Sequence, residues 1–234
     1  LIFIIFSYSI LILISFYIIK NEGLNKREKF VLPESIKNSF VVSKKAENCF
    51  DINYIHKKDN KDKICKIGNI KKNEIDFLIF GDSHIISFYD VFDSLAQKFD
   101  KSGLFVGYSA CPPIINVHTL LKNKERNCYK LNKQVFDILI EENIKNLILI
   151  SNWTYYTDGK YTGSDKMNYL NLTPSRSGNR ETSKKAFAKG IADTLETYNK
   201  LGKNIFIFEQ PPLQKMSAKS IYYKSINKDL KEFK

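Results

Sequence analysis

Histidine is scarce in this chain of 234 residues, which has three, His56, His84 and His118. They lie far apart in the sequence, and none has cysteine or carboxylate neighbours at the spacing of a metal-binding motif. The sequence therefore predicts no metal site and no cofactor. Scarce histidine also limits acid–base catalysis, because histidine is the usual general base beside a nucleophilic serine.

Arginine is scarce as well, and this bears on the net charge of +12. A basic chain invites a nucleic-acid partner. The arginines are Arg27, Arg126, Arg176 and Arg180, and all other basic side chains are lysines spread along the chain. This scatter predicts a cationic, solvated surface and no nucleic-acid partner.

The four cysteines form no Cys-x-x-Cys motif, which argues against a zinc site or a redox-active motif. They fall in two local pairs, Cys49 with Cys65 and Cys111 with Cys128. We expect two disulfides that close short loops, each worth about 3 kcal/mol. Disulfides imply an oxidising compartment. Four free thiols are the alternative.

The first nineteen residues contain no charged side chain. This length of apolar sequence suits a transmembrane helix over residues 1–19, and no features of a cleaved signal peptide are visible. The basic residues that follow favour a cytoplasmic domain by the positive-inside rule, whereas the cysteine pairs favour the other side. We expect an extracytoplasmic linker and cap over residues 20–74. Because the chain begins with Leu1, we also expect it to be a piece of a longer protein.

Residues 75–234 alternate between short apolar runs and helical periodicity. The expected strands are 75–80, 104–108, 147–150 and 205–208, and the expected helices are 85–99, 129–143 and 181–201. The stretch 154–180 is polar and predicts a long surface loop. Strands separated by helices pair in parallel, so the pattern predicts a three-layer α/β/α sandwich with a parallel, flavodoxin-like sheet.

Ligands bind beyond the carboxyl ends of the strands in such sheets. Ser83, Cys111, Asn152 and Gln210 each follow a predicted strand, so we expect them to line one cleft. Ser83 would stand at the first turn of a helix, where a free N–H and the helix dipole suit a nucleophile. The alternative is that Asp82 and Ser83 only cap the helix.

The run Phe80-Gly81-Asp82-Ser83-His84 resembles the first motif of the SGNH hydrolase superfamily. Its form is that of extracytoplasmic SGNH domains fused to membrane acyltransferases of the acyltransferase-3 family. Three further features are similar to that subgroup: the preceding apolar segment, the run Ser109-Ala110-Cys111-Pro112-Pro113, and Asn152-Trp153 after the third strand. The resemblance covers nearly the whole chain.

The resemblance implies that Ser83 is the nucleophile and that its N–H is one oxyanion donor. Asn152 would donate to the oxyanion or position the acyl group, with a capped strand end as the alternative. Asp82, His84, Trp153 and Gln210 would lie close to the substrate. Gly107, inside the second strand, receives no role.

One motif of the superfamily is missing. Its Asp-x-x-His block supplies the base and the carboxylate, but this chain has no histidine after His118. We therefore expect the chain to be incomplete at its C-terminus and inactive alone. His56 and His118 are expected in loops, and His84 is expected to point away from its neighbour Ser83.

The function implied by the resemblance is O-acyl transfer through a serine acyl-enzyme. An upstream membrane acyltransferase domain would bring an acyl group, commonly acetyl, across the bacterial inner membrane. The SGNH domain in the periplasm would pass it to a cell-surface polysaccharide such as lipopolysaccharide. A membrane-anchored esterase and a non-catalytic binding module are the alternatives.

Overall fold

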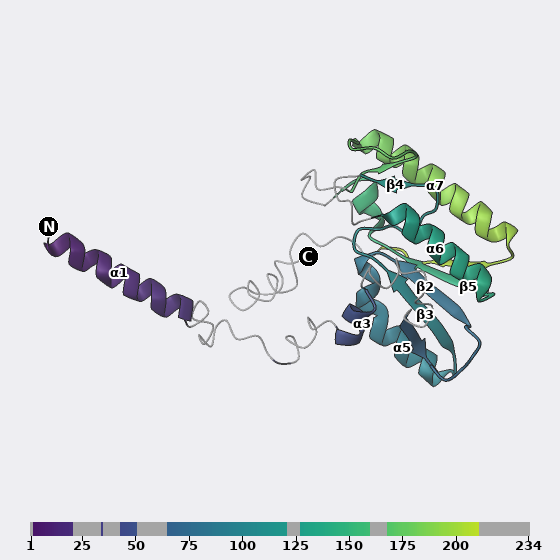
Figure 1. Ribbon diagram of the computed structural model, residues 1–234, viewed down its shortest axis with the longest axis horizontal. Coiled ribbons are helices and arrows are strands. Elements are labelled where there is room, and N and C mark those ends of the chain that lie inside the picture. The colour runs from purple at the N-terminus through teal and green to yellow at the C-terminus, as the bar shows by residue number, and fades with distance from the viewer. Residues whose placement is uncertain are drawn as a thin grey trace, which may run out of the picture. The chain divides into compact units, whose positions relative to one another are not determined.

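The computed structural model describes residues 2–20, 34, 43–50, 65–120, 127–159 and 168–210 (Figure 1). The chain divides into two compact units. One contains helix α1 (Ile2–Lys20), and the other, residues 42–213, contains every further element named below. Over the described ranges, no helix has both the length and the apolar character that a membrane crossing requires. The transmembrane helix predicted over residues 1–19 is therefore not shown.

The central sheet has five strands in the order β1-β3-β2-β5-β7. Four of them run parallel: β2 (Phe77–Gly81), β3 (Ser102–Gly107), β5 (Asn146–Ile150) and β7 (Asn204–Ile207). The edge strand β1 (Cys65–Gly68) pairs antiparallel with β3. The predicted α/β class with a mostly parallel sheet is confirmed, but the prediction of a wholly parallel sheet missed β1, which lies in the segment expected to be linker and cap.

Helices cover both faces of this sheet (Figure 1). Alternate residues of a strand point to opposite faces, so Leu78 and Phe80 of β2 pack in one core and Ile79 packs in the other. The first core also contains residues of α6 (Cys128–Glu141) and α7 (Arg180–Lys200). The second contains residues of α3 (Lys44–Asn48), η3 (Ser83–Phe88) and α5 (Tyr89–Lys98).

The stretch predicted as a long surface loop has structure of its own. It contains the 3-10 helix η4 (Trp153–Tyr156) and the short strand β6 (Leu170–Asn171), which pairs with β4 (His118–Thr119). Tyr156 and Leu170 are fully buried in a third core, together with residues of α7 and of the loop after β3. Tyr156 and Leu170 therefore anchor the described parts of this stretch to the rest of the domain.

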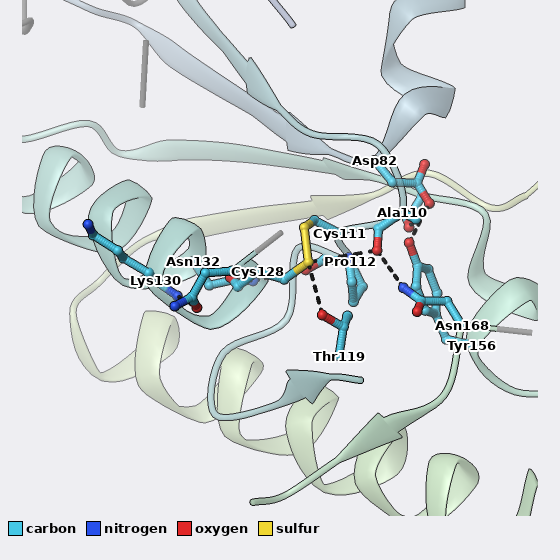
Figure 2. Close-up of a disulfide and its surroundings, with 12 residues drawn as sticks. Asp82, Ala110, Cys111, Pro112, Thr119, Cys128, Lys130, Asn132, Tyr156 and Asn168 are labelled. Atoms are coloured by element: carbon cyan, nitrogen blue, oxygen red, sulfur yellow. Dashed lines mark hydrogen bonds between the residues drawn. A yellow bond between two sulfur atoms is a disulfide. The ribbon is translucent and has the colours of Figure 1, made fainter. Parts of the chain in front are cut away.

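Two disulfides confirm the predicted pairs, and the described part of the chain has no free cysteine. Cys49–Cys65 joins the end of α3 to β1, with 5.4 Å between the Cα atoms. Cys111–Cys128 joins the loop after β3 to the start of α6, as Figure 2 shows. Such bonds persist in oxidising compartments, which fits an extracytoplasmic domain.

Candidate active site

The site begins at the end of β2, where the backbone passes very close to its neighbours. A Cβ atom on Gly81 would lie 1.8 Å from the carbonyl oxygen of Ile150, and one on Gly107 would lie 2.4 Å from the carbonyl oxygen of Gly81. Only glycine fits such close approaches. Gly107 thus has a packing role at the edge of the sheet where the candidate residues gather.

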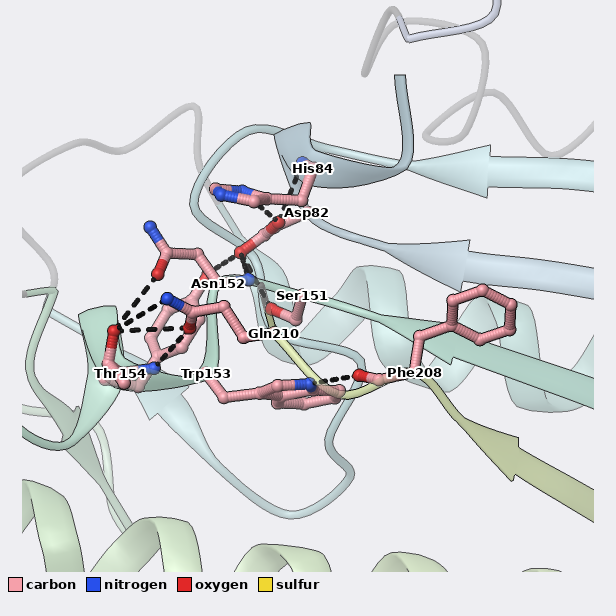
Figure 3. A network of polar contacts seen from close by, with 9 residues as sticks. Asp82, His84, Ser151, Asn152, Trp153, Thr154, Phe208 and Gln210 are labelled. Atoms are coloured by element: carbon pink, nitrogen blue, oxygen red, sulfur yellow. Dashed lines mark hydrogen bonds and ion pairs between the residues drawn. The ribbon is translucent and has the colours of Figure 1, made fainter. Parts of the chain in front are cut away.

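Asp82 is the centre of the polar network at this edge (Figure 3). It is 1% exposed. Its Oδ2 accepts hydrogen bonds from the Ser151 hydroxyl at 2.7 Å, the Asn152 N–H at 2.9 Å and the Tyr156 hydroxyl at 2.9 Å. Its Oδ1 accepts from the His84 N–H at 2.9 Å. Asp82 thus caps η3 and ties β2 to the end of β5 and to η4.

These donors hold the carboxylate in its charged form. Burial by itself would raise the pKa of Asp82, but the contacts with the His84 side chain and N–H, with Ser151 and with Asn152 together lower it below its usual value. Burial and the nearby Asp82 charge in turn raise the pKa of Tyr156 well above its usual value, so its hydroxyl stays protonated.

Ser83 stands next to this buried carboxylate but is itself exposed. No described residue accepts a hydrogen bond from its hydroxyl or from its N–H. A first-turn N–H has no partner within the helix, so it remains available to a ligand. Ser83 is therefore held in place by the neighbouring Asp82, while its own hydroxyl and N–H have no hydrogen-bond partner among the described residues.

The Asn152 side chain is oriented by a short chain of hydrogen bonds (Figure 3). Gln210 donates from Nε2 to the Thr154 hydroxyl at 3.1 Å, and that hydroxyl lies 3.3 Å from Oδ1 of Asn152. The Thr154 N–H also donates to Oε1 of Gln210 at 2.9 Å. Because Oδ1 of Asn152 is the acceptor, Nδ2 is left as a donor without a partner among the described residues.

Trp153, the residue after Asn152, packs and hydrogen-bonds within the domain. Its indole Nε1 donates to the Phe208 carbonyl oxygen at 2.8 Å, and its ring meets Phe187 of α7 edge-on with 6.2 Å between centroids. The indole therefore joins η4 to the residue that follows β7.

The structure brings most of the predicted site residues together. Asp82 contacts His84 and Asn152 directly, and Gln210 joins through Thr154. Cys111 does not line the cleft as expected, because it is fully buried in its disulfide.

Three further residues were missed: Ser151, Thr154 and Tyr156. Tyr156 lay in a polar stretch without periodicity, so nothing in the sequence marked it as a partner of Asp82.

The two described histidines, His84 and His118, have different surroundings. Nδ1 of His84 lies 3.3 Å from Oδ1 of Asp82, within ion-pair reach when protonated but without the geometry of a hydrogen bond. His118 stacks on Tyr129, and burial lowers the pKa of His118. His56 lies outside the described residues. Within the described ranges, no group of three histidine, cysteine or acidic side chains could hold a metal.

A solved structure of the periplasmic domain of a Salmonella ser. Paratyphi A lipopolysaccharide acetyltransferase is similar to this chain, with 13% identity and a TM-score of 0.38. The match covers 58% of this chain and 45% of that one, so the chain spans less than half of that domain. A search of curated proteins found no match. A family model described as the SGNH domain fused to AT3 domains matches residues 49–232. Because this match covers most of the chain, the protein belongs to the family of SGNH domains that are fused to AT3 (acyltransferase-3) domains.

Proposed function

We propose that this domain transfers an acyl group through a covalent intermediate on Ser83. The observation that carries the proposal is the exposed Ser83, fixed at the edge of the sheet by the buried Asp82 and free of hydrogen bonds to described residues. A nucleophile needs this combination of rigid backbone and accessible hydroxyl.

In the first step, the Ser83 oxygen attacks the carbonyl carbon of an acyl donor. The hydroxyl proton passes to a general base. No described residue that could act as this base is in hydrogen-bond contact with Ser83. The carbonyl oxygen takes up the electron pair and becomes an oxyanion. The Ser83 N–H and Nδ2 of Asn152 are the two free donors that would stabilise it.

In the second step, the tetrahedral intermediate collapses, the donor's leaving group departs with a proton, and an acyl ester remains on Ser83. A hydroxyl of the acceptor then attacks this ester. The acceptor proton goes to the base, a second tetrahedral intermediate collapses, the acyl–oxygen bond to Ser83 breaks, and the base returns the proton to the Ser83 oxygen, which regenerates the serine. Hydrolysis follows the same course with water as the acceptor.

The proposed acyl group is acetyl, and the proposed acceptor is a sugar hydroxyl of a cell-surface polysaccharide such as lipopolysaccharide. Family membership supports a membrane acyltransferase domain as the source of the acyl group. The two disulfides support a location outside the cytoplasm. The proposed compartment is the periplasm, beside the bacterial inner membrane. In this arrangement the membrane domain would deliver the acyl group, and the SGNH domain would carry out the final transfer to the sugar hydroxyl.

The direct test replaces Ser83 by alanine in the full-length protein produced in its own cells. Ser83→Ala should abolish O-acetylation of the extracted polysaccharide, measured by NMR. Ser87→Ala is the matched control, because Ser87 is an exposed serine on the same helix η3, and it should leave acetylation unchanged. Full acetylation in Ser83→Ala would disprove the proposal.

A second test separates the alternatives. The purified full-length protein is incubated with an activated acetyl ester, with and without polysaccharide. Acetate release that the polysaccharide does not suppress indicates an esterase, whereas no acetyl group on Ser83 by mass spectrometry indicates a binding module. Asn152→Ala should slow acyl transfer about 100-fold, the usual cost of one oxyanion donor.

A further inference from the structure

A pocket of about 280 Å³ opens between α6, α7 and the loop after β3. Helix α6 supplies Tyr129, Asn132, Lys133 and Phe136 to its lining. The loop supplies Ile115 and Asn116, and α7 supplies Thr197. None of these residues belongs to the network around Asp82, so this is a separate site. Its volume lies just below the range of drug-sized ligand sites, about 300–1,000 Å³, which suits a ligand of one ring.

The walls of this pocket are fixed in position before any ligand arrives. The disulfide Cys111–Cys128 and a hydrogen bond from Nδ2 of Asn132 to the Pro112 carbonyl oxygen, at 3.1 Å, hold the loop against α6 (Figure 2). The Ile115 N–H donates to the Thr194 hydroxyl at 3.1 Å, which holds the same loop against α7. A preformed pocket binds with little loss of conformational entropy.

The aromatic side of the pocket is also held in place. His118 stacks on the Tyr129 ring with 4.4 Å between centroids and 9° between planes. Phe136 packs against the buried Tyr198, with 5.8 Å between the ring centroids. Rigid aromatic rings offer a flat apolar surface to the C–H face of a cyclic ligand.

The polar side of the pocket is complementary to a ligand that carries hydrogen-bond donors and a negative charge. Asn132 is 2% exposed, and its Oδ1 has no hydrogen-bond partner among the described residues, while Nδ2 is bound by two carbonyl oxygens. A buried acceptor without a partner is costly. Asn132 lines the pocket, so a small turn of its side chain would bring Oδ1 to a ligand hydroxyl that supplies the missing donor. The Thr197 hydroxyl adds a further polar group.

Lys133 provides the positive charge. It is exposed, and no carboxylate in the described ranges forms an ion pair with it. The lining contains no acidic residue. Asp193, which contacts the lining residue Asn116 at 3.5 Å from its amide nitrogen, is bound to Lys189. An anionic group on the ligand would therefore meet a cation that forms no ion pair with a described residue.

We propose that this pocket binds a uronic acid, a sugar ring that carries a carboxylate. The ring would lie against Tyr129 and Phe136, a ring hydroxyl would donate to Asn132, and the carboxylate would pair with Lys133. This binding does not involve Ser83.

The test is ligand-observed NMR with the whole chain, using sodium glucuronate and, as the neutral comparison, glucose. Wild type should bind glucuronate more tightly than glucose. Lys133→Met keeps the length of the side chain but removes the charge, and it should weaken glucuronate binding about tenfold while leaving glucose binding unchanged. Lys130→Met, on the same helix but outside the lining, should bind both sugars as wild type does.

The absence of glucuronate binding to wild type, or equal binding to wild type and Lys133→Met, would overturn the inference. Tyr129→Ala provides a second readout and should weaken the binding of both sugars, because both use the aromatic wall. Far-ultraviolet circular dichroism establishes that each variant is folded. Ser83→Ala should bind glucuronate normally, so failure of the proposed acyl transfer and failure of this site are distinguishable.

Discussion

Replacing Asp82 by asparagine tests whether the buried carboxylate organises the candidate site. In wild type, the two oxygens of Asp82 accept from the Ser151 and Tyr156 hydroxyls and from the N–H groups of Asn152 and His84. An asparagine of the same shape has one oxygen. If that oxygen faces the three donors at Oδ2, the amide nitrogen faces the His84 N–H, and that hydrogen bond is lost.

The expected cost follows from these contacts. A hydrogen bond to a charged group contributes about 1.5–3 kcal/mol, and a neutral one about 0.5–1.5 kcal/mol. Three bonds would each weaken by about 1 kcal/mol and the fourth would be lost, while the smaller desolvation of a neutral amide offsets part of the sum. We expect the free energy of unfolding of Asp82→Asn to fall by about 3 kcal/mol at pH 7.

The dependence on pH gives this prediction a second signature. Because the folded-state pKa of Asp82 is lowered, its contribution to stability is present above the unfolded pKa, about 3.9, and is lost as pH falls through the folded pKa. The difference between wild type and Asp82→Asn should therefore shrink from pH 7 to pH 3.

Urea unfolding followed by tryptophan fluorescence is the assay, because Trp153 is the single tryptophan of the chain and lies in the site. Asp90→Asn is the control, since Asp90 is an exposed acid in the first turn of α5, and it should change the unfolding free energy by less than about 0.5 kcal/mol. A loss in Asp82→Asn no larger than in Asp90→Asn, or a difference that stays constant with pH, would refute the argument.

The remaining predictions concern the scaffold. Gly81→Ala should prevent folding, because its Cβ would lie 1.8 Å from the Ile150 carbonyl oxygen. Gly202→Ala should lower the free energy of unfolding by about 1 kcal/mol, since only its φ of +64° opposes a side chain. Soluble yield and urea unfolding compare the two variants, and an equal loss of stability in both would contradict the packing argument. Replacing Cys111 and Cys128 by serine should lower the unfolding free energy by about 3 kcal/mol, and peptide mapping without reductant should show the two linked in wild type. Free thiols there would contradict the structure.

Much of the fold could be predicted because its elements carry local signals. The apolar run before Asp82 predicted β2, and the steps of three and four after it predicted α5. The cysteine spacing predicted both disulfides, since short loops bring their ends together at little entropic cost.

Two elements without such signals were missed. Strand β1 is four residues long and lies in a polar region, so its place was set by pairing with β3 and by the bond from Cys65 to Cys49. Tyr156 was read as part of a loop because its partners come from distant strands. Neither local periodicity nor propensity encodes such contacts.

The sequence by itself determined the α/β class, the two disulfides and the position of Ser83 just after a strand, because these depend on patterns within short segments. Only the tertiary structure decided which groups surround Asp82, that Cys111 is fully buried, and that a pocket opens between α6, α7 and the loop after β3. The physical reason is that hydrogen bonds and cavities form between side chains distant in sequence, and their geometry exists only after the sheet and helices have packed.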